Sequence, residues 1–249
     1  MPSLRLDQAL VERGLCPSRE NAKRAILAGR VRLNDRVPLK ASDTVKDGDT
    51  LTLETPDRYV SRGGQKLEHG LRHFSLDVKG ITAVDIGAST GGFTDCLLQH
   101  GASTVYSVDV GSGQLAWKLR GDPRVKVMEK MNARFLTRKD FGSVFPGADL
   151  VVADCSFISL KKILPPAVVL LNDSGKILAL VKPQFEAGKL EVSRGRGVIT
   201  DPAIHARVLG ELKKFVDESG GMSWAGETES PLLGPAGNKE FLVLLEKKL

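Results

Sequence analysis

Three apolar segments of the sequence each meet a charged residue that could take part in acid–base chemistry. Asp154 follows one of these segments, Lys182 follows a second, and Glu240 opens a third. If the segments are neighbouring strands, these charges meet at the edge of the sheet where ligands bind in parallel α/β folds. Two carboxylates and an amine at that edge could orient and deprotonate a weakly acidic group. The simpler interpretation is a structural ion pair between Asp154 and Lys182.

A glycine-rich turn follows the apolar segment 81–86 and precedes a predicted helix. Residues 85–92 read Asp-Ile-Gly-Ala-Ser-Thr-Gly-Gly. A dinucleotide-binding turn needs Gly-x-Gly-x-x-Gly spacing, so that the backbone can approach a pyrophosphate. Here Ser89 stands in place of the second glycine, and Asp85 precedes the turn. A carboxylate there suits a ligand with a positive charge and no phosphate, so we predict S-adenosylmethionine as the cofactor.

The predicted cofactor site extends to the next strands. Asp109 lies 24 positions after Asp85 at the end of a second strand, where an acid would accept the hydroxyls of a ribose. Asn132 follows the third strand and would bond the edge of an adenine. The predicted cofactor-binding residues are Asp85, Gly87, Ala88, Ser89, Gly91, Gly92, Phe93, Asp109, Asn132 and Asp154. The alternative is that these acids cap helices or lie in loops.

Strands and helices alternate from residue 61 to the end of the chain, which predicts a doubly wound, mostly parallel α/β sheet of Rossmann-like type. We expect helices at about 62–74, 92–100, 113–120, 159–171 and 202–219. We expect parallel strands at 81–86, 103–109, 125–128, 148–153 and 175–181. Two last strands, 222–228 and 240–245, predict an antiparallel hairpin at the sheet edge. Residues 186–200 read as a basic loop.

Residues 1–53 form a separate small α+β unit in this interpretation, and 54–60 form a linker. Two helices are expected, from Arg5 to Gly14 and from a Ser18 cap to about Gly29, with strands at Val31–Leu33 and Thr50–Leu53 around an Asn34-Asp35 turn. Residues 1–36 hold eight Lys/Arg and four Asp/Glu, a net charge of +4, which suits phosphate binding. The alternative is a solvated charged face. The predicted RNA-binding residues are Arg5, Arg19, Lys23, Arg24, Arg30, Arg62, Lys189, Arg194 and Arg196.

The composition favours a polyanionic partner. The 249 residues carry a formal net charge of +6, and only 5% of them are aromatic, so platforms for stacking bases are few. Three cysteines, Cys16, Cys96 and Cys155, lack metal-site spacing, so we expect no metal and reduced thiols in the cytoplasm. No apolar run approaches about 18 residues, so we expect neither a membrane span nor a secretory signal. We expect a monomer.

Longer motifs resemble a known family. Residues 85–95, 113–117, 156–160 and 181–186 together resemble the TlyA/hemolysin A family, and the likeness covers nearly the whole chain. Residues 61–249 resemble the FtsJ-type ribose 2'-O-methyltransferases, whose Lys–Asp–Lys–Glu tetrad matches Lys66, Asp154, Lys182 and Glu240. Residues 1–53 resemble the alpha-L RNA-binding module of ribosomal proteins. The resemblance implies S-adenosylmethionine-dependent 2'-O-methylation of cytidine in ribosomal RNA, with ribosomal subunits as the substrate.

The tetrad suggests a division of roles. Lys182 would be the general base, which requires its amine to lose affinity for the proton through burial or a nearby cation such as Lys66. Asp154 would orient Lys182, and Glu240 would hold Lys66 or the target ribose. The family carries Arg-x-Trp-Val between its domains, whereas this chain has the shorter Arg58-Tyr59-Val60. The role of that linker therefore stays open.

Other activities remain as alternatives. Enzymes that methylate amino groups carry two prolines after the equivalent strand, whereas residues 154–157 read Asp-Cys-Ser-Phe. Methylation of cytosine C5 would need a thiolate, and Cys155 reads rather as a packed thiol. A catalytically silent RNA-binding factor, a nicotinamide-dependent oxidoreductase and a cytolysin are the remaining alternatives. The oxidoreductase rests on fold analogy alone.

Overall fold

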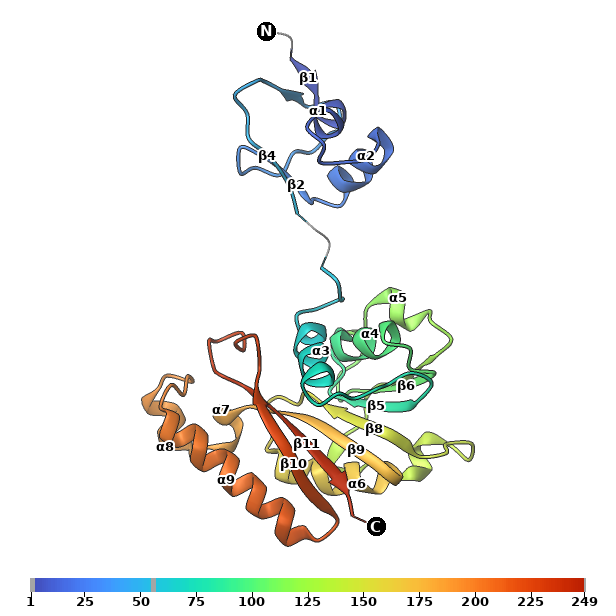
Figure 1. Cartoon of the computed structure of the whole chain (residues 1–249), viewed down its shortest axis with the longest axis vertical. Coiled ribbons are helices and arrows are strands. Elements are labelled where there is room, and N and C mark those ends of the chain that lie inside the picture. Colours follow the sequence, from blue (N-terminus) through green and yellow to red (C-terminus); the bar gives the residue numbers. More distant parts are fainter. Residues whose placement is uncertain (1–2, 55–56, 249) are drawn as a thin grey trace. The chain divides into compact units, whose positions relative to one another are not determined.

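The structure, a computed structural model, describes residues 3–54 and 57–248 and divides the chain into two compact units (Figure 1). The N-terminal unit is Met1–Arg58 and the C-terminal unit is Tyr59–Leu249. The boundary falls inside the predicted linker 54–60, of which Thr55 and Pro56 lie outside the described residues. Separate clusters of buried apolar side chains form a core in each unit.

The N-terminal unit packs two short helices against two small β-ladders. Its elements are β1 (Leu4–Arg5), α1 (Leu6–Glu12), α2 (Arg19–Leu27), β2 (Val31–Leu33), β3 (Thr44–Val45) and β4 (Leu51–Leu53). Both predicted helices and the predicted strands β2 and β4 are confirmed, and the Ser18 hydroxyl accepts the backbone N–H of Asn21 at 3.3 Å as a helix cap. Asn34 and Asp35 have the positive φ of a tight hairpin turn. The strands β1 and β3 were not predicted, because two residues leave no periodic pattern.

The C-terminal unit is built on a seven-stranded sheet in the order β10-β11-β9-β8-β5-β6-β7. Its strands are β5 (Thr82–Ile86), β6 (Thr104–Val108), β7 (Val125–Met128), β8 (Ala148–Ala153), β9 (Leu171–Val181), β10 (Met222–Glu229) and β11 (Phe241–Lys247). The five strands from β9 to β7 run parallel, and the hairpin β10–β11 adds to β9 in the antiparallel sense. The predicted doubly wound sheet with a terminal antiparallel hairpin is confirmed. Its switch point lies between β5 and β8, where the strand order reverses.

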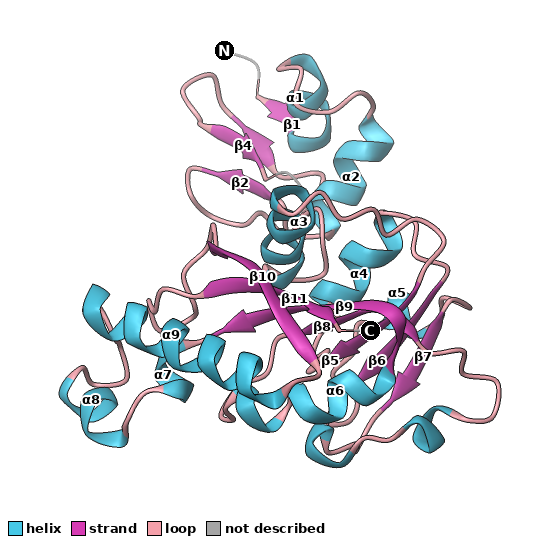
Figure 2. Cartoon of the chain, turned by 60° about the horizontal axis from the view of Figure 1, so that its bottom comes forward, coloured by secondary structure: helices cyan, strands magenta, loops and turns pink. Residues whose placement is uncertain are grey.

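Helices cover both faces of this sheet (Figure 2). They are α3 (Gly63–His73), α4 (Gly92–Gln99), α5 (Trp117–Arg120), α6 (Leu164–Leu170), α7 (Pro183–Glu186), α8 (Lys189–Arg194) and α9 (Pro202–Ser219), with 3-10 turns at Ala133–Phe135, Arg138–Phe141 and Leu160–Lys162. Alternate residues along each strand enter opposite cores, because side chains in a strand point to alternate faces. On β9, Leu178 packs beneath α3 and α4, whereas Ile177 and Ala179 belong to the core with α6 and α9.

Three predicted segments differ from the structure. The helix expected at 113–120 is only α5, because Gly113 has a φ of +73° and Ala116 is extended. The helix expected at 159–171 begins at Leu164 after a separate 3-10 turn, since Pro165 and Pro166 fit only the start of a helix. The segment 186–200 is not all loop, because Glu191 accepts the N–H of Gly188 and closes the first turn of α8.

Gly64 allows α3 to pack on the start of the C-terminal unit, and this predicts a stability effect. A Cβ atom at Gly64 would overlap the ring of Tyr59, which is buried. Gly64→Ala is therefore expected to lower the free energy of unfolding by about 1–3 kcal/mol. Gly210→Ala is the control, because a Cβ there meets open space on exposed α9 and alanine favours the helix. Urea denaturation followed by tryptophan fluorescence measures both, and equal midpoints for the two variants would refute the packing argument.

Candidate active site

The sheet brings the charged strand ends to one edge. Asp154 follows β8 and Lys182 follows β9, which run parallel to each other. Strand β11 runs antiparallel to β9, with Phe241 opposite Val181, so it begins where β9 ends. Glu240, just before β11, therefore stands beside Lys182 at the carboxyl edge of the sheet. The antiparallel hairpin is what places this last carboxylate there.

These residues form two ion pairs. The Lys182 ammonium lies 2.5 Å from Asp154 Oδ1 and donates a hydrogen bond to Ser156 Oγ at 3.0 Å. The Lys66 ammonium donates to Glu240 Oε2 at 2.5 Å, and both side chains of this second pair are almost completely buried. Helix α3 carries Lys66 close to the sheet because Gly70, one turn further along the helix, has no side chain. A Cβ at Gly70 would lie only 3.0 Å from a Leu178 methyl group.

A cleft of about 1230 Å³ opens at the same edge of the sheet. Of the predicted cofactor-binding residues, Gly87, Ser89, Asp109, Asn132 and Asp154 line it. Gly87 has a φ of +83°, and a Cβ there would lie 2.9 Å from the carbonyl oxygen of Asp154. Only glycine fits this close approach between the first and fourth strand ends of the parallel sheet. Ala88 lines a small adjoining pocket with Ser89 and Asp109.

Four backbone donors of the glycine turn are bonded within the protein. The N–H groups of Gly87 and Ala88 both donate to the Val108 carbonyl, and that of Gly91 donates to Ala88. The Ser89 N–H donates to Asp109 Oδ2 at 2.8 Å. A phosphate-binding turn needs such groups free to face the ligand. These four groups are therefore not available to bind a pyrophosphate.

Two further predicted ligands also have protein partners. Asp109 Oδ1 accepts the Gly111 N–H at 2.7 Å, and Asn132 Oδ1 accepts the Arg134 N–H at 3.2 Å. Each carboxylate oxygen can accept more than one hydrogen bond, so Asp109 retains the capacity to bind hydroxyls.

Four residues predicted to bind the cofactor do not line the cleft, and their contact with a ligand stays a prediction. Asp85 is completely buried, and its Oδ2 accepts the backbone N–H and the hydroxyl of Thr94 at 3.0 and 2.6 Å. It thereby fixes the first turn of α4. A Cβ at Gly91 would overlap Leu119, and one at Gly92 would overlap Ser61. Phe93 belongs to the core. These residues support the glycine turn through contacts with the rest of the protein.

Asp85 also predicts a pH dependence of stability. Burial raises the pKa of Asp85, the hydrogen bonds from Thr94 lower it, and the charges of Asp154 and Asp109 raise it. Together they bring this pKa to about 7. The unfolded chain releases this proton near pH 4, whereas the folded chain holds it to about pH 7. The contribution of Asp85 to the free energy of unfolding therefore falls as the pH rises from about 4 to about 7. Asp85→Asn keeps an oxygen for Thr94 but cannot titrate.

The measurement for Asp85 is urea denaturation of the wild-type chain and of Asp85→Asn at several pH values between 5 and 8. We expect the variant to gain stability relative to the wild type as pH rises, by on the order of 1 kcal/mol per pH unit. All other titrating groups are common to the two proteins. Parallel curves for the two proteins would contradict this role for Asp85.

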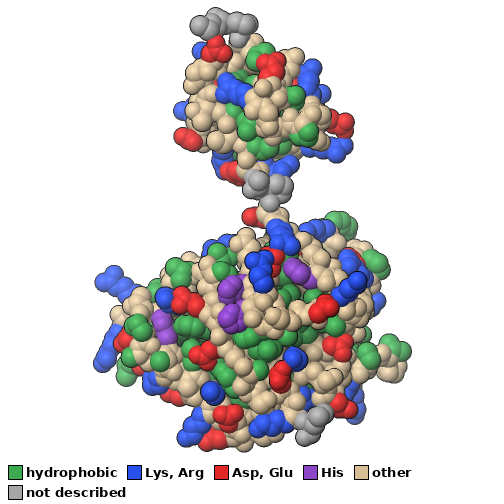
Figure 3. All heavy atoms as spheres, viewed as in Figure 1, with side chains coloured by type: hydrophobic (Ala, Val, Ile, Leu, Met, Phe, Trp, Pro, Cys, Tyr) green, Lys and Arg blue, Asp and Glu red, His purple; other side chains and the backbone are tan. Residues whose placement is uncertain are grey.

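The predicted RNA-binding residues fall into different environments. Arg5 and Arg19 both bind the buried Asp7 carboxylate, at 3.1 and 2.8 Å, and keep about half of their side chains exposed. Arg24 pairs with Glu20, and Arg62 donates to the Leu233 carbonyl. Lys23, Arg194 and Arg196 are exposed, Arg30 is half-buried and Lys189 lines the cleft. Lys and Arg side chains are spread over the visible face of the N-terminal unit (Figure 3).

Some cleft residues were not predicted. Ser156 contacts the Lys182 ammonium, and Gln184 and Phe185 line the cleft on α7. Phe157 is 90% exposed, has a φ of +62° and packs against Phe185 with 5.1 Å between ring centroids. The available signal was an aromatic residue three positions after each charged strand end.

Comparison with known proteins identifies both units. Residues 59–247 match the model of the FtsJ-like methyltransferase family, and residues 4–51 match that of the S4 domain. The chain belongs to the FtsJ-like methyltransferase family. Its N-terminal unit is an S4 domain, which agrees with the predicted likeness to a ribosomal-protein module.

Relatives of this FtsJ-like methyltransferase extend over nearly the whole chain. YqxC of Bacillus subtilis, named as a candidate rRNA methyltransferase, is 49% identical over 97% of this chain and 85% of its own length. The 16S/23S rRNA (cytidine-2'-O)-methyltransferase TlyA of Mycobacterium tuberculosis is 46% identical over 97% of this chain and 89% of its own. A solved structure of a candidate hemolysin from Streptococcus thermophilus is 46% identical, with a TM-score of 0.74, and covers 100% of this chain and 90% of that one. The resemblance to TlyA is confirmed.

Within residues 3–54 and 57–248, none of the helices is both long and apolar enough to cross a lipid bilayer.

Proposed function

We propose that this protein transfers a methyl group from S-adenosylmethionine to the 2'-oxygen of a cytidine in ribosomal RNA within ribosomal subunits. The observation that carries the proposal is the two lysine–carboxylate pairs at the carboxyl edge of the sheet: Lys182 with Asp154, which lines the cleft, and the almost completely buried Lys66 with Glu240. The name and near-complete alignment of TlyA support the substrate. The S4 domain supports an RNA partner.

The cleft fits S-adenosylmethionine better than a dinucleotide. Four donors of its glycine turn are bonded within the protein, which favours a ligand without a phosphate, and Asp109 and Asp154 suit ribose hydroxyls and a cationic centre. Gly87, Ser89, Asp109, Asn132 and Asp154 would hold the cofactor. When bound, it supplies an electrophilic methyl group on a sulfonium.

The task of the protein side chains is to aim and deprotonate the ribose hydroxyl. In the proposed mechanism Lys182 Nζ, as the free amine, accepts the proton of the 2'-hydroxyl. Asp154 and Ser156 hold this nitrogen at 2.5 and 3.0 Å, which fixes its direction. The adjacent pair of Lys66 and Glu240 orients the ribose from the other side. Alignment of the hydroxyl oxygen with the methyl donor lowers the barrier further.

The N-terminal unit would dock the substrate. Lys23, Arg24 and the outward faces of Arg5 and Arg19 offer cations to phosphates. Lys189, Arg194 and Arg196, at α8 of the C-terminal unit, would contact RNA near the cleft. We propose that the protein acts as a monomer in the cytoplasm, where ribosomal subunits are found. The domain limits 1–53 and 61–249 remain part of this proposal.

The direct test supplies tritiated S-adenosylmethionine with small and large ribosomal subunits in separate reactions. We expect tritium in the RNA of at least one subunit, at a linkage that resists alkali because the 2'-oxygen is blocked. Transfer to neither subunit, with cofactor binding intact, would overturn the proposal in favour of a silent RNA-binding factor. Lysis of erythrocytes by the purified protein, without any transfer, would favour a cytolysin.

A further inference from the structure

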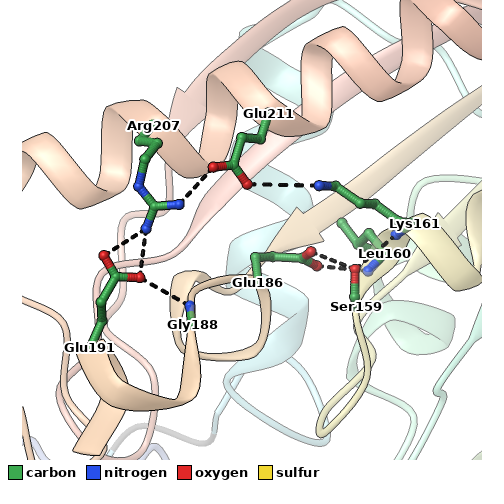
Figure 4. Close-up of polar contacts among 8 residues, drawn as sticks. All are labelled: Ser159, Leu160, Lys161, Glu186, Gly188, Glu191, Arg207 and Glu211. Carbon is green, nitrogen blue, oxygen red and sulfur yellow. Dashed lines mark hydrogen bonds and ion pairs between the residues drawn. The ribbon is translucent and has the colours of Figure 1, made fainter.

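Glu186 is a partly buried carboxylate beside the cleft that the proposed mechanism does not use. It is the last residue of α7, four positions after Lys182. Its Oε2 accepts the Ser159 hydroxyl at 2.6 Å, and its Oε1 accepts the backbone N–H of Leu160 at 2.6 Å (Figure 4). The carboxylate therefore joins two chain segments that lie 26 residues apart in sequence.

Each of these two segments carries a proposed catalytic group. Segment 154–160 begins with Asp154, and segment 182–186 begins with Lys182. The last ladder pair between β8 and β9 joins Ala153 to Ala179, so backbone pairing ends before both segments. Side-chain contacts hold the segments together beyond that point.

Three contacts bridge the segments in succession. Lys182 meets Asp154 and Ser156, the rings of Phe157 and Phe185 pack at 5.1 Å, and Glu186 closes the far end. Asp154, Ser156, Phe157 and Phe185 line the cleft, so the first two contacts lie where a ligand would bind. Glu186 itself does not line the cleft, although its partner Ser159 does, so its carboxylate is suited to hold the two segments together while substrate enters.

We infer that Glu186 is a positioning residue that sets the separation of Asp154 and Lys182. This inference rests on the proposed function, because it assigns Glu186 to the same reaction. Its action is indirect: the carboxylate fixes Ser159 and Leu160, and these fix the segment that carries Asp154 and Ser156 against the Lys182 nitrogen. A displacement of a reacting group by about 1 Å can cost about 100-fold in rate.

A neighbouring ionic cluster provides a matched control. Arg207 on α9 binds Glu191 and Glu211 at 2.6 Å, and Glu211 lies 3.8 Å from the Lys161 ammonium (Figure 4). Its side chains are more than 30% exposed, so each ion pair is worth little. Glu211→Gln removes a carboxylate from the same region without touching either hydrogen bond of Glu186.

The test compares Glu186→Ala, Glu186→Gln and Glu211→Gln in steady-state methylation of ribosomal subunits, with cofactor affinity measured by calorimetry. We expect Glu186→Ala to lower kcat by about 10- to 100-fold while the cofactor Kd changes less than about threefold. Glu186→Gln should restore at least half of kcat, since its amide oxygen can accept the Leu160 N–H and its NH₂ can donate to Ser159. Glu211→Gln should match the wild type.

Several outcomes would overturn the inference. They are an unchanged kcat in folded Glu186→Ala, a Glu186→Gln variant as slow as Glu186→Ala, and an equal loss in Glu211→Gln. If Glu186→Ala fails to fold, Ser159→Ala decides, because it removes one of the two bonds and should lower kcat several-fold. A wild-type rate for Ser159→Ala would overturn the inference. Lys182→Ala, assayed in parallel, tests the proposed function itself, because full activity there would reject the mechanism whatever Glu186 does.

Discussion

Lys182→Ala is expected to slow methyl transfer to ribosomal subunits by about 10³-fold, since a general base contributes about 10²- to 10⁴-fold. Lys182 Nζ, directly after β9, is held by Asp154 and Ser156, both of which line the cleft. The cofactor Kd should change less than about threefold, because the glycine turn and Asp109 lie on other strands. Single-turnover transfer of tritium measures the rate.

Two controls separate base catalysis from charge. Lys182→Arg keeps a cation that cannot deprotonate near neutral pH, so it should be nearly as slow as Lys182→Ala. Lys176→Ala removes a lysine of β9 that pairs with Glu246 on β11, and should be fully active. A wild-type rate for Lys182→Ala, or for Lys182→Arg, would contradict the assignment of Lys182 as the base.

Glu240→Ala is expected to lower the free energy of unfolding by about 3–5 kcal/mol, because it leaves the Lys66 ammonium buried without its partner. The Lys66 and Glu240 side chains are only 8% and 1% exposed and lie 2.5 Å apart. Glu229→Ala breaks a comparable pair with Lys239 whose side chains are 50% exposed, so it should cost about 1 kcal/mol or less. Urea denaturation measures both variants.

The role of Lys66 can be resolved in the same series. Joint replacement, Lys66→Met with Glu240→Leu, should recover much of the stability lost in Glu240→Ala, since it removes the uncompensated charge. Activity should stay low in this double variant. Lost RNA binding in Lys66→Ala would make Lys66 a positioning residue, whereas lost turnover alone would place it in the chemistry. Equal stability losses for Glu240→Ala and Glu229→Ala would contradict the buried pair.

The features predicted best from the sequence are those that follow from a single physical rule. Buried parallel strands are short apolar runs, so their ends were visible, and Asp154 and Lys182 could be placed at one sheet edge. The antiparallel hairpin followed from two strand-like segments joined by a loop after the last helix. Lys66 was different, because nothing in its helical spacing shows that it reaches Glu240. It came only from the family resemblance.

Other features depended on tertiary contacts that a linear pattern does not contain. Asp85, Gly91 and Gly92 match a ligand-binding turn by type, yet they pack behind it against Thr94, Leu119 and Ser61. Whether a glycine of this turn faces a ligand or the rest of the protein depends on the elements packed against it. Here those elements are α3 with the residues before it, and α5. Glu186 gave no signal because its partners, Ser159 and Leu160, lie in a 3-10 turn that was predicted as part of a longer helix.

The central claim is that the cleft delivers a methyl group to a ribose oxygen, and the identity of the methylated nucleoside tests it most directly. Ribosomal subunits modified by the wild-type protein are digested to nucleosides, which are separated and identified by mass spectrometry. The account predicts 2'-O-methylcytidine, and its absence from subunits treated with Lys182→Ala. Methyl groups found on the base instead, at N4 or C5 of cytosine, would contradict it.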